Sequence, residues 1–310
     1  IAVQAYTDSG DHGDIDMCDE LTERDNDAFL ERSLSARVSR RTFTALTTGI
    51  VLGASLPAGA SPLPVAESDV LVKTPDGQAD CYFVHPTEGR HAAVIVWPDI
   101  LGLRPAFRAM GKRLAEAGYA VLVVNPYYRS TTAPVVEAGD SFRDPPVREK
   151  VLPLARQLSP ETNVTDAGAF IAFLDSQGAV DTTRKVGTTG YCMGGPITFR
   201  TAAAFPDRVG AGASFHGGGL VTDAPDSPHQ LVAQMDASFL VAIAENDDER
   251  QPEAKDILRQ RFDAAGLGAE IEVYQGAMHG WCPPDSRVYD EAQAERAWAR
   301  LLVLFDEALA

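Results

Sequence analysis

The sequence predicts a single-domain α/β fold with a mainly parallel sheet and helices on both faces. Apolar runs of strand length alternate along the chain with segments of helical periodicity, which is the pattern of strands joined by crossover helices. The apolar runs are continuous, as expected of strands that are buried on both faces. The chain has 310 residues, 45% of them hydrophobic. That is enough to bury the core of one such domain.

Residues 1–38 are expected to form a disordered acidic extension. They carry 10 acidic and 3 basic side chains, which gives a net charge of −7, and they show no apolar periodicity. The first methionine is Met17. Translation that started there would leave out residues 1–16, so both Ile1 and Met17 are possible starts.

Residues 39–60 resemble a twin-arginine export signal. Arg40 and Arg41 are followed two positions later by Phe43, then by the weakly apolar stretch 45–56 and the small residues 58–60. The lysine that often follows the phenylalanine is missing, and an ordinary basic-to-apolar extension is the alternative. The signal predicts that the protein is periplasmic or exported and that the twin-arginine machinery transports it. The mature chain would then start near Ser61. If the signal is not used, the protein stays cytoplasmic.

The overall charge excludes some partners. The formal net charge is −17, so both nucleic acid and anionic membranes would repel the chain. No window of 18 apolar residues predicts a membrane-spanning helix. The four cysteines are too few and too scattered for a disulfide framework or a zinc site. They are Cys18, Cys81, Cys192 and Cys282.

The elements follow in order after a proline-rich connector at 61–64. A hairpin is expected first, because alternating stretches at 70–73 and 81–85 flank a Thr-Pro-Asp-Gly turn. The continuous run 93–97 is a buried strand, 107–117 has helical spacing closed by Gly118, and 120–124 is the next strand. Helices and strands then alternate at 166–175, 185–189, 195–205, 210–215, 239–244, 252–265, 271–274 and 292–309.

A candidate nucleophile lies between the strand 185–189 and the helix 195–205. Residues 190–195 read Gly-Tyr-Cys-Met-Gly-Gly, which fits the G-x-S-x-G nucleophile elbow with Cys192 in place of serine. The helix N-terminus favours an anion, so the thiol is expected to ionise more readily than a free one. The alternative is a tight turn in which Cys192 is merely a small buried hydrophobe.

An acid and a base follow later strands. Parallel strands place ligands beyond their carboxyl ends, and there the chain has Cys192, Asp247 and His279, the order of the α/β-hydrolase fold. His279 would accept the thiol proton and protonate the leaving group, while Asp247 would orient the imidazole. Asp248 competes for the acid role, and both acids could belong to a solvated loop. His279 could likewise be an ordinary loop histidine.

Backbone N–H groups would stabilise the oxyanion, namely that of Met193 and that of Ile100 or Leu101. His216 begins a His-Gly-Gly-Gly run like the oxyanion motif of lipases, but that motif belongs before the nucleophile and His216 follows it by 24 residues. His279 and Cys282 alone do not make a metal site.

With these residues placed, the segment 65–310 resembles the dienelactone hydrolase family, the cysteine-nucleophile branch of the α/β hydrolases. The similar stretches are 96–104, 113–119, 190–195 and 278–281. The resemblance implies hydrolysis of a small-molecule lactone or ester through an acyl-cysteine, with no metal or organic cofactor. Acyl transfer or thioesterase chemistry on the same scaffold and a catalytically silent binding module are the alternatives.

The resemblance also assigns further site residues. Arg129 matches an arginine that binds the substrate carboxylate in the family, and Tyr128 and Trp281 are neighbouring candidates for substrate binding. The family's second such arginine is replaced by Pro283, which puts the dienelactone itself in doubt. Asp99 stands where the family has glutamate. It is expected to face the thiol and keep it protonated at rest, or else only to cap the following helix.

Overall fold

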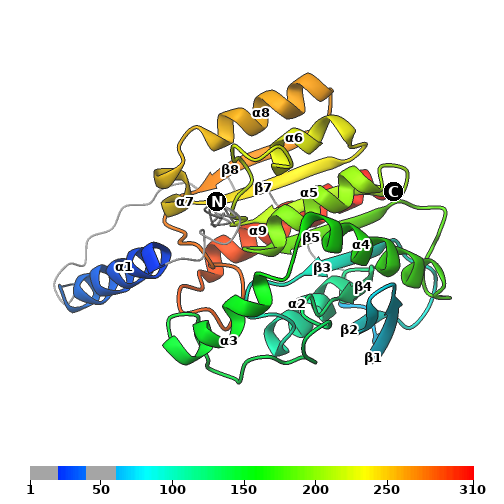
Figure 1. The fold of residues 1–310 in the computed structure, drawn as a ribbon, viewed down its shortest axis with the longest axis horizontal. Coiled ribbons are helices and arrows are strands. Elements are labelled where there is room, and N and C mark those ends of the chain that lie inside the picture. Colours follow the sequence, from blue (N-terminus) through cyan, green and yellow to red (C-terminus); the bar gives the residue numbers. More distant parts are fainter. Residues whose placement is uncertain (1–19, 40–60) are drawn as a thin grey trace, which may run out of the picture.

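A computed structural model describes residues 20–39 and 61–310, with side chains at 22–32 and 61–310. Within them the core is one eight-stranded sheet in the order β1-β2-β4-β3-β5-β6-β7-β8, flanked by helices (Figure 1). The strands are β1 (Val65–Thr74), β2 (Gly77–Pro86), β3 (Ala93–Trp97), β4 (Ala120–Val123), β5 (Val186–Tyr191), β6 (Val209–Phe215), β7 (Ser238–Ala244) and β8 (Ala269–Tyr274). The strands from β4 to β8 in this order pair in parallel. The predicted fold class is confirmed.

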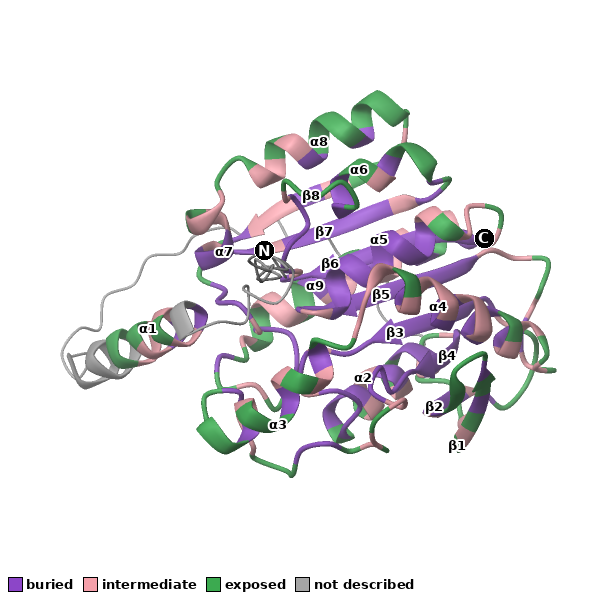
Figure 2. Cartoon of the chain, viewed as in Figure 1, coloured by how far each residue is buried: buried purple, intermediate pink, exposed green. Residues whose placement is uncertain are grey.

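The amino-terminal hairpin is antiparallel. β1 pairs with β2 in register around the predicted turn, and β2 pairs antiparallel with β4. The hairpin therefore extends an otherwise parallel sheet at one edge. All residues of β3, β4, β5 and β6 are buried (Figure 2), and for β3 and β4 their continuous apolar runs predict this.

Successive residues of each central strand point to opposite faces of the sheet and pack into two apolar layers, one on each face. In β3, Ile95 packs with α4 (Pro160–Asp175), α5 (Gly194–Ala204) and α8 (Ala254–Ala265) in one layer. Val94 packs on the opposite face with α2 (Pro105–Glu116) and α9 (Glu291–Ala308). This period of two along the strands and the helices on both faces give a three-layer core.

Some short elements are not visible in the apolar pattern. α3 (Pro145–Ala155) packs through Val147 and Val151 against a small third apolar cluster. α6 (Pro228–Leu231) leads into a 3₁₀ turn, Val232–Gln234. The acidic segment considered above as a loop is α7 (Glu245–Arg250), whose acids lie in its first turn, where they favour the helix N-terminus.

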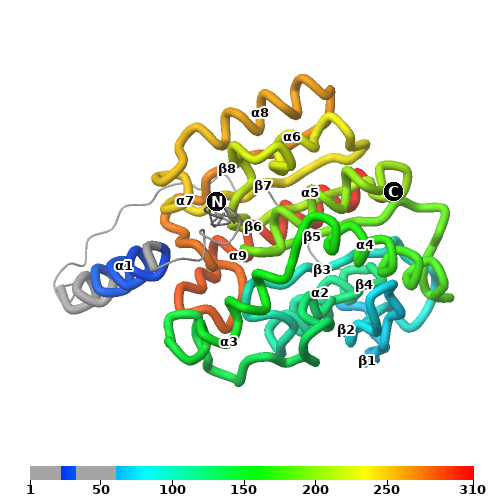
Figure 3. Tube along the Cα trace, viewed as in Figure 1, coloured from blue at the N-terminus to red at the C-terminus, as the bar shows by residue number. Residues whose placement is uncertain are grey.

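α1 (Glu20–Ser39) is the main departure from expectation. Figure 3 shows it extending away from the domain, and its residues 22–27 bond to arginines of the domain. The prediction of disorder is therefore wrong for residues 20–38. The helix is polar, and its partners are charged groups, so apolar periodicity gives no sign of it. Residues 1–19 and the candidate export signal at 40–60 lie outside the described part of the chain.

Candidate active site

Cys192 lies on a tight turn between β5 and α5. Its φ is +51°, a left-handed conformation that costs energy for a residue other than glycine. Two glycines permit the turn, because a Cβ at Gly190 would lie 2.0 Å from the Gly194 carbonyl oxygen, and one at Gly194 would lie 2.3 Å from that of Trp97. The Cys192 N–H donates to the Phe215 carbonyl at 3.0 Å and ties the turn to β6. The structure thus has the predicted elbow, with the thiol at the start of α5.

The predicted base and acid meet beside the elbow. His279 Nδ1 donates to Asp247 Oδ2 at 2.8 Å and lies 3.0 Å from Oδ1, and both side chains are about 5% exposed. Asp248 instead accepts from Lys255 Nζ at 2.5 Å. The His279 side chain lines the same pocket as Cys192. The thiol and the imidazole therefore share one pocket, and Asp247 rather than Asp248 contacts the histidine.

The electrostatics of this pocket favour a charged imidazole. Burial would lower the pKa of His279, because it removes water from the cation. The charges and hydrogen bonds of Asp247 and Cys192 outweigh burial and hold the pKa of His279 well above its usual value. Because Nδ1 of the His279 ring bonds to Asp247, the other ring nitrogen, Nε2, is the one available to the Cys192 thiol. The arrangement suits a thiolate–imidazolium pair.

Two polar residues before the acid fasten the loops after β7 and β8 together. Asn246 Oδ1 accepts from the His279 N–H at 2.8 Å. The Glu245 N–H donates to the Ala277 carbonyl at 2.9 Å, and Glu245 Oε2 accepts from the Gly276 N–H at 2.6 Å. These residues fix the base relative to the acid. The sequence analysis does not identify Asn246 as a site residue, although its position just after a predicted strand indicates one.

The candidate oxyanion donors lie on two segments held by Tyr127. Within the described chain the N–H groups of Ile100 and Met193 donate to no protein acceptor. The Leu101 N–H donates to Asp99 Oδ1 at 2.9 Å, so the expectation that Leu101 could serve as a donor is wrong. Tyr127 Oη donates to the Ile100 carbonyl at 2.8 Å and lies 3.2 Å from Met193 Sδ. It therefore connects the two segments.

Asp99 lines the same pocket as Cys192 but is bound by a buried arginine. Arg104 Nη1 and Nη2 donate to its two carboxylate oxygens at 2.6 and 2.9 Å, and Arg104 Nε donates to Asp285 at 2.7 Å. The alternative role as cap of the following helix is wrong, because Arg104 occupies the N-cap position of α2. The predicted effect of Asp99 on the thiol stays a prediction.

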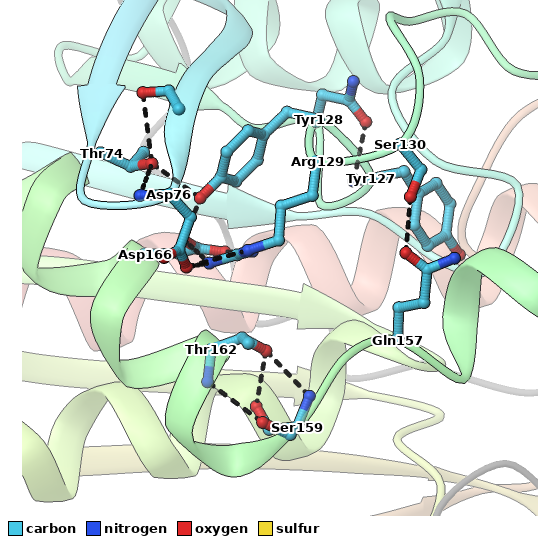
Figure 4. Close-up of polar contacts among 12 residues, drawn as sticks. Thr74, Asp76, Tyr127, Tyr128, Arg129, Ser130, Gln157, Ser159, Thr162 and Asp166 are labelled. Atoms are coloured by element: carbon cyan, nitrogen blue, oxygen red, sulfur yellow. Dashed lines mark hydrogen bonds and ion pairs between the residues drawn. The ribbon is translucent and has the colours of Figure 1, made fainter.

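Arg129 and Tyr128 lie in a separate polar cluster (Figure 4). Arg129 donates to both oxygens of Asp166 at 2.8 Å and to Asp76 at 2.5 Å. Tyr128 Oη donates to Asp166 at 2.7 Å and lies 2.8 Å from Thr74 Oγ1. Neither residue lines the active-site pocket. The expectation that they bind substrate is wrong. The Arg129 guanidinium, which the family resemblance assigns to a substrate carboxylate, is already paired with the buried carboxylate of Asp166.

Trp281 is also a packing residue rather than a substrate contact. Its side chain is fully buried, stacks on Tyr274 with ring centroids 5.2 Å apart, and is absent from the pocket lining. Its ring instead lies 5.0 Å from that of His216. The expectation of substrate binding is wrong here, because the large apolar ring fills the core beneath the histidine loop.

His216 lines the pocket although sequence reasoning set it aside. Its ring lies 5.1 Å from that of His279, and its φ is +40°. Neither ring nitrogen has a hydrogen-bond partner within the described chain. Burial, and then the charge of His279, hold the pKa of His216 well below its usual value, so its imidazole is neutral. It offers the pocket one neutral donor and one acceptor.

The active-site pocket gathers these groups and the start of α1. Thr22, Glu23 and Asn26 of α1 line it together with Cys192 and His279. Other residues of the lining are Asp99, Ile100, Arg104, Phe142, His216, Asp285 and Arg287. The contribution of α1 was missed, because no apolar pattern in residues 1–38 indicated a helix.

Neither a metal site nor a membrane span is found in the described residues. No three His, Cys, Asp or Glu side chains there are grouped to hold a metal ion. No described helix is both long and apolar enough to cross a bilayer. Cys81, Cys192 and Cys282 are buried and form no disulfide among the described residues, while Cys18 lies outside them.

Comparison with known proteins agrees with this geometry. The model of the dienelactone hydrolase family matches residues 79–309. The chain belongs to the dienelactone hydrolase family. It is 29% identical over 284 residues to a candidate carboxymethylenebutenolidase of Methylorubrum extorquens, covering 87% of this chain and 94% of that one. It is 26% identical over 257 residues to the carboxymethylenebutenolidase of Rhodococcus opacus, covering 81% and 96%.

Solved structures of dienelactone hydrolases share the fold of this family member. A candidate dienelactone hydrolase from Klebsiella pneumoniae superposes with a TM-score of 0.68 at 21% identity, covering 79% of this chain and 99% of that one. Dienelactone hydrolase from Anabaena variabilis gives 0.56 at 19% identity, covering 79% and 99%. The unmatched part of this chain is mainly its first 78 residues in the family comparison.

Proposed function

We propose that this family member hydrolyses a carboxylic ester or lactone through an acyl-cysteine intermediate on Cys192. The observation that carries the proposal is the buried His279–Asp247 pair in the pocket that Cys192 lines, at the carboxyl ends of β8, β7 and β5. The family supports ester or lactone hydrolysis, and the two relatives above are named for a lactone hydrolase. The small-molecule substrate would enter the pocket that the thiol lines.

Acylation begins with the thiolate. Cys192 Sγ attacks the carbonyl carbon, and the carbonyl electron pair moves onto oxygen, where the N–H groups of Ile100 and Met193 stabilise the negative charge. The tetrahedral intermediate then breaks its bond to the leaving oxygen. His279 delivers its Nε2 proton to that oxygen, and Asp247 keeps the ring oriented throughout. The products are an acyl-cysteine and an alcohol, which stays attached to the acyl group when the substrate is a lactone.

Deacylation uses the same groups in reverse. Neutral His279 accepts a proton from water as the oxygen attacks the thioester carbonyl. The second tetrahedral intermediate expels Cys192 Sγ as thiolate and releases the carboxylic acid. The thiolate–imidazolium pair is then restored. The neutral His216, whose ring nitrogens face no protein partner, is positioned to hydrogen-bond the substrate or this water.

A substrate panel tests the proposal. p-Nitrophenyl esters and simple lactones are assayed with the wild type, Cys192→Ala and Cys192→Ser, and Cys192 is analysed by mass spectrometry for an acyl adduct. We expect kcat/KM to fall by about 10³-fold or more in Cys192→Ala. Retained turnover in that variant would exclude the cysteine mechanism. Product that appears as a transferred ester when an alcohol is added would indicate acyl transfer, and inertness of every substrate would indicate a binding module.

We also propose that the protein is exported by the twin-arginine route. The support is the pattern at 39–60, which precedes the family domain. Arg40→Lys combined with Arg41→Lys should leave the precursor in the cytoplasm, as measured by fractionation. Undiminished periplasmic protein would count against export by this route.

A further inference from the structure

We propose that the acidic start of α1 is a reversible plug of the active-site mouth, held by a ring of arginines on the domain. This inference depends on the proposed function only in that the plugged pocket is the one that contains Cys192. The plug consists of residues 22–27. The ring consists of Arg143, which precedes α3, Arg250 at the end of α7, and Arg287, which precedes α9.

Each arginine of the ring pairs with an acid of the plug. Arg250 donates to Asp25 at 2.5 Å and to Thr22 Oγ1 at 2.6 Å. Arg143 lies 3.0 Å from Asp27. Arg143 and Arg250 are 107 residues apart in the chain, so the helix bridges separate parts of the domain beside the pocket.

Arg287 contributes two more contacts. It lies 3.1 Å from Asp27 and 3.7 Å from Glu23. Both Arg287 and Glu23 line the pocket itself. The charged contacts of the plug therefore extend from the rim into the cavity.

The plug also reaches the catalytic loop. Asn26 Nδ2 donates to the His279 carbonyl oxygen at 3.3 Å. Asn26 is 6% exposed and Thr22 is 3% exposed, unusually low for polar residues at the start of a surface helix. Cys192 behind them is 4% exposed. A substrate that needs to reach the sulfur must compete with this segment.

The contacts of the plug are of a kind that releases easily. No described residue of α1 belongs to the apolar clusters of the domain. The plug is held by ion pairs and hydrogen bonds, and the arginines and Asp25 remain partly exposed. Exposed ion pairs are individually weak and are screened by salt. The helix can therefore leave without disrupting the core, and the ring would then be open to another acidic segment.

The position of the plug in the chain suits such release. Residues 22–27 precede the candidate export signal, and the family domain follows that signal. Cleavage near Ser61 would separate the helix from the domain. The precursor would then have a covered thiol and the processed chain an open one.

Two full-length variants with opposite charge changes provide the test. One removes the acids of the plug, Glu23→Gln with Asp25→Asn and Asp27→Asn. The other removes the ring, Arg143→Gln with Arg250→Gln and Arg287→Gln. Cys192 alkylation by iodoacetamide is followed by peptide mass spectrometry, beside kcat/KM for the best ester of the panel.

The matched control neutralises three acids that pair with arginines away from the mouth, namely Glu270→Gln, Glu272→Gln and Glu295→Gln. We expect both test variants to be alkylated about tenfold faster than wild type and the control to be unchanged. Raising the salt to about 0.5 M should speed the wild type and leave the variants unaffected.

The design separates access from thiol electrostatics. If the charges acted only through the field at the sulfur, removal of acids and removal of arginines would move the alkylation rate in opposite directions. That result, or rates equal to the control, would overturn the plug. The proposed function is judged separately: faster alkylation without ester turnover would support the plug and refute the hydrolase, whereas ester turnover with unchanged rates would do the reverse.

Discussion

At the scale of single residues, Asp247 and Asp248 follow β7 as neighbours, yet only one of them is placed to orient the candidate catalytic histidine. The chain order indicates an acid at this loop, but it does not distinguish neighbours. Because 245–250 is helical, adjacent side chains point in different directions. Asp247 is turned inward to His279, while Asp248 meets Lys255.

Asp247→Asn should therefore lower kcat/KM by about 10³-fold, since the amide cannot stabilise the imidazolium or hold the same tautomer. Asp248→Asn is the matched control and should stay within a few-fold of wild type, because it loses only a partly exposed ion pair. Steady-state kinetics on the same ester measure both. A larger loss from Asp248→Asn would mean that the acid is misassigned.

The raised pKa of His279 predicts how stability depends on pH. A histidine whose pKa is higher in the folded state stabilises the fold fully below its unfolded pKa, about 6.5, and loses this contribution as pH rises through the folded pKa. The stability advantage of wild type over Asp247→Asn should be largest near pH 6 and shrink at alkaline pH. Urea unfolding at several pH values measures this difference. An advantage that grows with pH would contradict the charged pair.

At the scale of elements, the apolar runs predict the sheet, and the strand ends indicate where the candidate nucleophile, acid and base lie. Cys192 and His279 follow from positions after buried strands, because a parallel sheet brings those ends together. Contacts with non-local partners were not predictable in this way. Arg129 matches a family motif, yet its guanidinium is paired with Asp166 of α4, which lies 37 positions away in sequence. α1 was missed because its partners are arginines far along the chain.

The elbow offers a test of element geometry. Gly190→Ala would place a Cβ 2.0 Å from a backbone oxygen, so β5 and α5 would have to separate. We expect a loss of several kcal/mol of stability and of nearly all turnover. Gly178→Ala is the control, since a Cβ there would meet nothing within 4 Å. Thermal unfolding and ester kinetics report on both, and a Gly190→Ala enzyme as stable and active as the control would contradict the steric argument.

At the scale of the whole molecule, the Arg129 cluster connects parts that are distant in sequence. Asp76 lies in the turn between β1 and β2, Arg129 follows β4, and Asp166 belongs to α4 (Figure 4). The hairpin forms one edge of the sheet, and α4 packs against it in one apolar layer. The cluster therefore holds the amino-terminal hairpin to the helical layer, and it does so away from the thiol.

Because the cluster lies away from the thiol, a mutation can distinguish a structural role of Arg129 from a role in substrate binding. Arg129→Gln leaves the carboxylate of Asp166, only 3% exposed, without its cation, which typically costs about 3 kcal/mol or more for a buried pair. We expect a lower melting temperature with KM for an anionic ester unchanged. Adding Asp166→Asn removes the unpaired charge and should restore part of the lost stability, as measured by a double-mutant cycle. A KM that rises selectively for anionic esters, with stability unaffected, would instead return Arg129 to the substrate site.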